Sequence, residues 1–113
     1  MMRAVVLAFR GKESCFLHAM LNVIDMKERG LDVAFIIEGE ATKTIASVIK
    51  PDHKYHQFYE DSKGSIVAVC EACSKMAGTL DIIKNEGLPI VNKMKGHVPL
   101  ATYVEEGYCI ITF

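Results

Sequence analysis

The sequence has no hydrophobic run that approaches the roughly 18 apolar residues needed to span a membrane. It also has no excess of positive charge, because 13 Lys and Arg stand against 14 Asp and Glu in 113 residues. The first absence predicts that the chain has no membrane span, and the second argues against nucleic acid as the main partner. Half of the residues are hydrophobic, which is too many for a disordered chain. We therefore expect one folded domain over residues 1–113.

A secretory signal is not expected either. The first apolar run, residues 4–9, is followed directly by Arg10 and Lys12, whereas the core of a signal peptide needs about 7–15 apolar residues. This run is more typical of a buried strand, and we expect a cytoplasmic protein whose thiols stay reduced. The four cysteines are then not expected to form a disulfide framework. They are Cys15, Cys70, Cys73 and Cys109.

Apolar runs alternate with helical spacings along the chain. Strands are predicted at residues 4–9, 33–37, 66–70, 88–91 and 108–113. Helices are predicted at residues 13–29, 41–49, 54–63, 71–86 and 98–106, with Ser14 as the first N-cap and a break at Gly78. Glycines that end helices in the left-handed conformation are expected at Gly30, Gly64, Gly87 and Gly107. The alternation predicts a three-layer α/β/α sandwich with a mostly parallel five-stranded sheet.

A ligand site is expected at the carboxyl ends of these strands, as in other open parallel sheets. Reactive side chains follow the first three strands at residues 10–14, 38–40 and 70–73. The loop at residues 9–14 has a single glycine, Gly11, and so lacks a phosphate-binding glycine signature. We therefore expect neither a nucleotide nor another cofactor.

Cys70 lies where a buried strand is predicted to give way to a helix. A thiol at a helix N-terminus meets free backbone N–H groups, which can lower its pKa from about 8.5 to roughly 3.5–7.5. Lys12, Lys75 or Lys93 would add to this effect if they lay close by. The thiolate form is the nucleophile, so Cys70 is the favoured reactive residue. The alternative is that Cys70 is a small hydrophobic residue of the core.

Cys73 follows at C-x-x-C spacing, which places both thiols on one face of a helical turn. Such a pair can cycle to a disulfide, resolve an adduct on its neighbour, or supply half of a metal site. A second C-x-x-C is absent, so the metal ligand set is incomplete unless folding adds His53, His56 or His97. A thioredoxin-like enzyme is disfavoured because this motif follows the third predicted strand.

The remaining candidates are weaker. Cys15 and Cys109 lie in apolar helix and strand patterns and are expected in the core. His97 follows Gly96 near the predicted rim, where it could donate a proton, although a local hydrogen bond is the favoured interpretation.

The segment at residues 67–78, VAVCEACSKMAG, resembles the cysteine segment of the DsrE/TusD-like (DsrE/DsrF-like) sulfur-relay family. In that family an apolar strand ends in a cysteine, and an alanine-rich helix with a glycine follows. The closing run at residues 106–113, EGYCIITF, is similar to small cytoplasmic DsrE-like proteins. The resemblance implies a flavodoxin-like sandwich that assembles into homo- or hetero-oligomers, often trimers or hexamers, and we expect a homo-oligomer here. The sulfur-carrying cysteine of the family matches Cys70, whereas Cys73 and the Ser74-Lys75-Met76 stretch depart from its best-known carriers.

Three functional hypotheses follow. The first is a sulfurtransferase or persulfide carrier that loads Cys70, uses Cys73 as an auxiliary thiol, and exchanges sulfur with donor and acceptor proteins. The second is a non-enzymatic oligomeric scaffold or binding protein with structural cysteines. The third is a metal- or redox-active dithiol protein built on Cys70 and Cys73.

Overall fold

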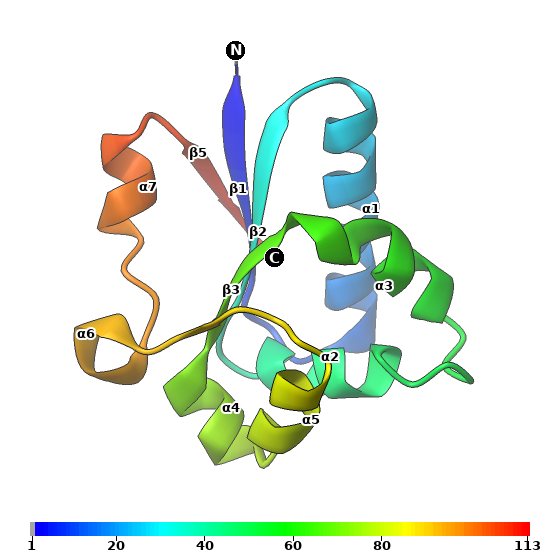
Figure 1. The fold of residues 1–113 in the computed structure, drawn as a ribbon. Helices are drawn as coiled ribbons and strands as arrows, with labels where there is room; N and C mark the ends of the chain where they lie inside the picture. The colour runs from blue at the N-terminus through cyan, green and yellow to red at the C-terminus, as the bar shows by residue number, and fades with distance from the viewer. Residues whose placement is uncertain (1) are drawn as a thin grey trace.

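The computed structural model describes residues 2–113 and confirms the α/β class (Figure 1). Its strands are β1 Arg3–Ala8, β2 Asp32–Ile37, β3 Ile66–Cys70, β4 Ile90–Val91 and β5 Cys109–Thr112. Its helices are α1 Glu13–Glu28, α2 Ala41–Val48, α3 His56–Ser62, α4 Glu71–Ala77, α5 Leu80–Asn85, α6 Lys93–Gly96 and α7 Ala101–Glu105, with a 3-10 turn η1 at Lys63–Ser65.

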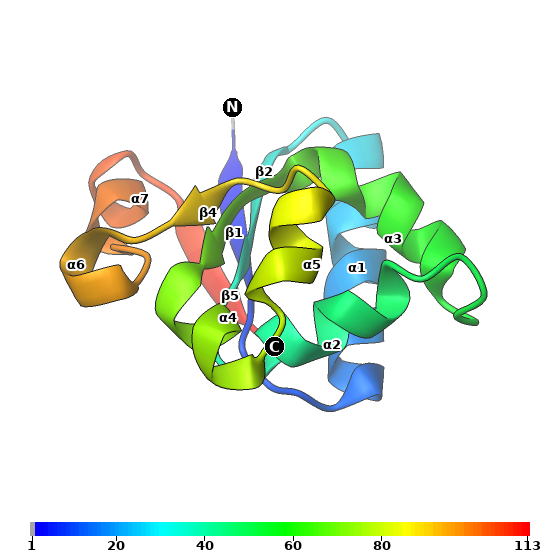
Figure 2. The same cartoon turned by 60° about the horizontal axis from the view of Figure 1, so that its bottom comes forward.

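The five strands form one sheet in the order β4-β3-β2-β1-β5. All four strand pairings are parallel, so the prediction of a mostly parallel five-stranded sheet is confirmed. Figure 1 shows α1 and α3 on one side of the sheet and α7 on the other. In Figure 1 the N-terminus lies at the top and the parallel strands run downward. Their carboxyl ends therefore lie at the lower edge of the sheet, where α2, α4 and α6 are found. Figure 2 brings this edge forward, with α4 between α6 and α2.

Each face of the sheet has its own core, because successive side chains of a strand point to opposite faces. In β1, Val6 and Ala8 pack with α1, whereas Val5 and Leu7 pack on the opposite face. The larger core includes the fully buried Tyr59 of α3, whose hydroxyl donates to Glu86 at 2.6 Å. The smaller core includes two buried side chains that matter for the site, Cys70 and Val98.

Several local predictions need correction. Ser14 is not the N-cap of α1, since Lys12 takes that position without a side-chain hydrogen bond. Gly64 lies in the 3-10 turn without a positive φ, whereas Gly30, Gly87 and Gly107 have φ of 81°, 81° and 86° as predicted. Gly78 ends α4 in the left-handed conformation and confirms the predicted break.

The segment between β4 and α7 differs most from the prediction. The expected helix at residues 98–106 is confined to Ala101–Glu105, and an unexpected short turn, α6, precedes it. Within α6, Met94 and Lys95 have positive φ values of 41° and 57°. No helix within residues 2–113 has the length and apolar character that crossing a membrane requires.

Candidate functional site

Cys70 is the last residue of β3 and the N-cap of α4. Its Sγ accepts a hydrogen bond from the backbone N–H of Cys73 at 3.4 Å, and its carbonyl accepts one from the Ser74 hydroxyl at 2.7 Å. Both contacts arise because the strand passes into the helix without a linker. They confirm the predicted position of Cys70 at the rim of the sheet.

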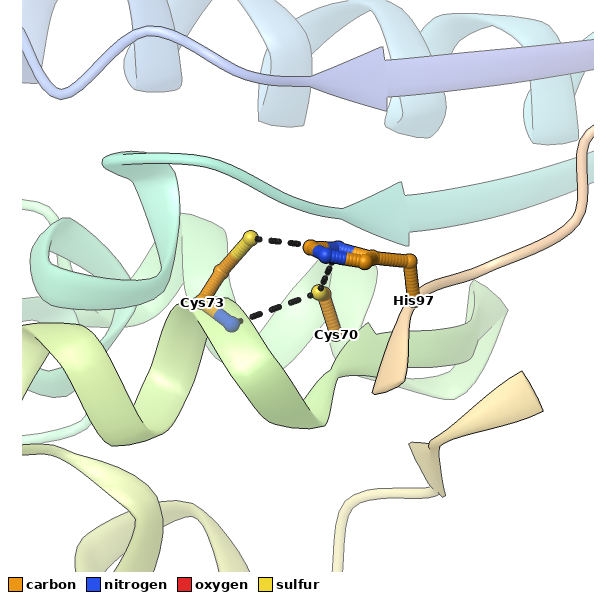
Figure 3. A group of neighbouring side chains, drawn as sticks. All are labelled: Cys70, Cys73 and His97. Atoms are coloured by element: carbon orange, nitrogen blue, oxygen red, sulfur yellow. Dashed lines mark hydrogen bonds between the residues drawn. The ribbon is translucent and has the colours of Figure 1, made fainter. Parts of the chain in front are cut away.

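Cys73 lies one helical turn further along and is half-buried. Its side chain and that of Cys70 point toward the ring of His97 (Figure 3). The Nδ1 atom of His97 lies 3.2 Å from the Cys70 Sγ and 3.9 Å from the Cys73 Sγ. The three ligating atoms all lie within 4.8 Å of one another. We call Cys70, Cys73 and His97 the Cys–Cys–His cluster.

The loop that carries His97 explains how a residue 24 positions beyond Cys73 reaches it. After β4 the chain makes the tight α6 turn, in which the backbone N–H of His97 donates to the carbonyl of Lys93. Gly96 has a φ of +96°, and a Cβ built there would lie 3.0 Å from the Cβ of Ala72 in α4. The absence of a side chain at Gly96 therefore lets the loop approach α4 closely. Val98 then enters the smaller core and anchors the far side of His97.

The favoured interpretation of His97, a local hydrogen bond, is wrong for its side chain, because the ring contacts the two sulfurs. The other candidate histidines lie elsewhere. His53 pairs with Glu13 at 3.0 Å, and His56 pairs with Glu60 at 3.2 Å. The sequence signal that indicates a site role for His97 is its position shortly after the fourth strand. This strand, β4, adjoins β3 in the sheet, and β3 ends at Cys70.

Burial controls the protonation of Cys70. The residue is completely buried, and this burial, together with the interaction with the side-chain thiol of Cys73, raises the pKa of the Cys70 thiol to about 12. The backbone N–H of Cys73 acts in the opposite direction but is outweighed. The predicted lowering of this pKa is therefore wrong, since desolvation outweighs the short helix N-terminus. Lys75, one of the expected helpers, pairs instead with Glu71 at 3.4 Å.

Glu38, which directly follows β2, is a buried carboxylate close to the cluster. Desolvation raises its pKa, while a hydrogen bond from the backbone of Val98 and the neighbouring His97 act in the opposite direction. The negative charge of Glu38 also raises the pKa of the Cys70 thiol. An acidic group therefore faces the histidine and disfavours a lone thiolate at Cys70.

Cys73 opens on a pocket of about 400 Å³ at the carboxyl edge of the sheet. Its walls come from the segments after β1, β2 and β3, so the predicted convergence of these segments at one rim is confirmed. The lining is mainly apolar and consists of Phe9, Gly39, Glu40, Cys73, Met76 and Ala77. Cys73 therefore lines the pocket, whereas the completely buried Cys70 does not.

The two remaining cysteines stand apart from the cluster. Cys15 is half-buried on α1, and Cys109 is exposed on the edge strand β5. The prediction that Cys109 belongs to the core is wrong, because β5 has a neighbouring strand on one side only. The prediction that Cys15 belongs to the core is met only in part, because its side chain is half-buried.

Comparisons with known proteins bear on the family and the fold. No family model matches the chain. The chain is 36% identical over 95 residues to the Uncharacterized protein MJ0733 of Methanocaldococcus jannaschii, covering 84% of this chain and 77% of that protein. It also resembles the solved structure of a conserved protein of unknown function, BT1422 from Bacteroides thetaiotaomicron. That match has a TM-score of 0.76 and 20% identity over 98% of this chain and 94% of the other, and it supports the fold alone.

Proposed function

This chain belongs to the family of the Uncharacterized protein MJ0733 of Methanocaldococcus jannaschii, and we propose that it carries persulfide sulfur on Cys70 with Cys73 as the auxiliary thiol. The observation that carries the proposal is the convergence of both sulfurs on His97 Nδ1, at 3.2 and 3.9 Å. Two thiols and a proton acceptor are the groups that sulfur exchange requires. The segment that resembles DsrE/TusD-like proteins, residues 67–78, supplies both cysteines of this cluster.

We assign the entry of sulfur to Cys73, because it lines the pocket. In this step the neutral ring of His97 holds its own proton on Nε2. The Cys73 thiol gives its proton to Nδ1 of the same ring. The resulting thiolate attacks the terminal sulfur of the donor's persulfide. The donor's S–S bond breaks, the donor leaves as a thiolate that takes the proton from His97, and Cys73 holds the persulfide.

Transfer to Cys70 repeats the same chemistry inside the protein. His97 accepts the proton of the Cys70 thiol, and the Cys70 thiolate attacks the terminal sulfur on Cys73. The bond between that sulfur and Cys73 breaks, and Cys73 recovers a proton from His97. No oxidant is consumed in either step. Because the pKa of the Cys70 thiol is raised to about 12, this step depends on the adjacent base, and the buried position shields the stored sulfur from solvent.

The partners of this function are donor and acceptor proteins that reach the pocket. Phe9 is half-exposed and Met76 is 91% exposed beside Cys73, so an apolar contact surface surrounds the entry thiol. We also propose a cytoplasmic location, where thiols stay reduced, and a homo-oligomer such as a trimer or hexamer. The exposed edge strand β5 and the exposed Val104 of α7 offer surface for sister subunits. Light scattering after size-exclusion chromatography measures the subunit number.

The test of sulfur carriage uses a Cys15→Ser, Cys109→Ser background, which retains only the thiols of the cluster. The reduced protein is incubated with inorganic polysulfide, freed of the donor, and weighed by intact mass spectrometry. We expect a gain of one sulfur atom that a small acceptor thiol removes. Cys73→Ala in this background is expected to slow loading, and Cys70→Ala to leave no stable gain.

The matched control is the background variant with His97→Gln, which keeps both thiols but removes the base. Loading is expected to slow in this variant while its final extent is unchanged. A stable gain of sulfur in the Cys70→Ala variant, equal to that of the background, contradicts the assignment of Cys70 as the carrier.

A further inference from the structure

We propose that the Cys–Cys–His cluster is also a binding site for a zinc ion, with Cys70 Sγ, Cys73 Sγ and His97 Nδ1 as its three protein ligands. This site goes beyond sulfur carriage, because it assigns a metal to the cluster and does not depend on the sulfur chemistry. From the sequence alone the ligand set was incomplete. Folding adds the histidine that the C-x-x-C pair lacked.

The spacing of the three atoms fits a tetrahedral ion. Zinc lies about 2.3 Å from a thiolate sulfur and about 2.0–2.1 Å from an imidazole nitrogen. Ligands at tetrahedral angles are then separated by about 3.6 Å for a sulfur–nitrogen edge and about 3.8 Å for a sulfur–sulfur edge. The two observed sulfur–nitrogen distances, 3.2 and 3.9 Å, bracket the first value. The sulfur–sulfur separation is within 4.8 Å. We therefore expect small rotations of the side chains to be sufficient to bring all three atoms to one ion.

The backbone holds these ligands in place before any ion arrives. Cys70 and Cys73 belong to the first turn of α4, so their spacing is set by the helix. His97 is brought to them by a loop with two non-glycine residues, Met94 and Lys95, in the left-handed region. That conformation costs roughly 1–2 kcal/mol for each residue. Strained backbone of this kind is often kept where it positions functional groups.

The charge balance favours a divalent ion. Binding releases the two thiol protons to solvent, and two thiolates then neutralise the two charges of the ion. Glu38 also lies near His97, but burial raises the pKa of its carboxyl group and so disfavours a further negative charge there. A neutral cluster avoids the large desolvation cost of a bare buried thiolate or a bare cation. Thiolate and imidazole ligands at C-x-x-C spacing are typical of zinc.

The cluster supplies three ligands among residues 2–113, and zinc takes four. The fourth position then falls to solvent. The pocket beside Cys73 gives water a path to the cluster. Three protein ligands plus a water is the arrangement of exchangeable and catalytic zinc sites, as opposed to closed structural ones. A bound ion would also occupy both thiols, so zinc and sulfur loading are expected to exclude each other.

The experiment titrates the reduced, chelator-treated full chain with Zn²⁺ in competition with a chromophoric chelator, and separately with Co²⁺ as a spectroscopic probe. The site variants are Cys73→Ser and His97→Gln. The matched control is Cys109→Ser, which removes an exposed thiol outside the cluster. Far-ultraviolet circular dichroism and thermal melting confirm that each variant is folded.

We expect one Zn²⁺ for each chain and a thiolate-to-cobalt charge-transfer band in the near ultraviolet. Each site variant is expected to lose about 100-fold or more in affinity, since even residues that only support ligands cost 10–100-fold. Cys109→Ser is expected to bind like the wild type. Three results would overturn the proposal: no stoichiometric binding, His97→Gln as tight as the wild type, or loss of binding in Cys109→Ser. Sulfur loading is measured on the metal-free protein, so failure of either function is seen separately.

Discussion

Gly96→Ala is the substitution that most directly tests how the fold positions His97. Gly96 has a φ of +96°, which an alanine rarely adopts. The left-handed region costs a non-glycine residue roughly 1–2 kcal/mol. In addition, the new Cβ would lie 3.0 Å from the Cβ of Ala72, whereas carbon atoms in good contact lie about 3.5–4.0 Å apart. Overpacking of this kind costs about 1–3 kcal/mol. We expect the free energy of unfolding to fall by about 2–5 kcal/mol, the sum of these two costs.

Gly30→Ala is the matched control, because Gly30 has a φ of +81° and nothing lies within 4 Å of an added Cβ. It reproduces the backbone strain without the contact, so we expect a loss of only about 1–2 kcal/mol. Urea denaturation followed by circular dichroism measures both values. The site gives a second measurement, since displacement of the loop moves His97 away from the sulfurs. Sulfur loading is expected to slow in Gly96→Ala and to stay unchanged in Gly30→Ala. Equal stabilities and equal loading rates for the two variants would refute this account of the loop.

Three further substitutions test other parts of the structure. Tyr59→Phe removes the 2.6 Å hydrogen bond to Glu86 and is expected to cost about 1–3 kcal/mol in urea denaturation. Burial raises the pKa of the Tyr59 hydroxyl in the folded protein, so the unfolded chain loses the hydroxyl proton at a lower pH than the folded chain does. The wild type is therefore expected to lose stability above about pH 10 more steeply than Tyr59→Phe. Parallel plots of stability against pH for the two proteins would contradict this. Ser74→Ala removes the hydrogen bond to the Cys70 carbonyl and is expected to cost about 1 kcal/mol, and a change below measurement error would mean that this bond does not stabilise the start of α4. Lys95→Gly relieves a positive φ of 57°, so the melting temperature is expected to stay unchanged or to rise. A loss of more than about 1 kcal/mol in the free energy of unfolding, which is typical of glycine in a regular helix, would exclude strain at this position.

The sequence was sufficient to predict the sheet because its strands are local apolar patterns. The boundary at β3 and α4 coincides with the change from the run ending at Val69 to the polar Glu71. The break at Gly78 was visible for the same reason, since a glycine after a helical pattern has a local cause. These features depend on neighbouring residues alone, and they placed both Cys70 and Cys73 at the rim.

The role of His97 depends on contacts distant in sequence. The turn at α6 has left-handed residues that no local pattern indicates, and its position depends on the contact of Gly96 with Ala72. The protonation of Cys70 also escaped prediction, because its complete burial comes from the smaller core that Val98 helps to build. The exposure of Cys109 is not predictable in the same way, because an apolar strand pattern does not reveal which strand forms the edge of the sheet.

The measurement that tests the central claim most directly is the location of the sulfur after loading. The Cys15→Ser, Cys109→Ser protein is loaded with polysulfide, alkylated after unfolding, digested, and mapped by peptide mass spectrometry. We expect the sulfur to appear first on Cys73 at short times, and the sulfur that is retained after removal of the donor to be attached to Cys70. Retained sulfur on Cys73 alone would contradict the assignment of Cys70 as the carrier, and no retained sulfur on either residue would contradict the assignment of the Cys–Cys–His cluster as a sulfur carrier.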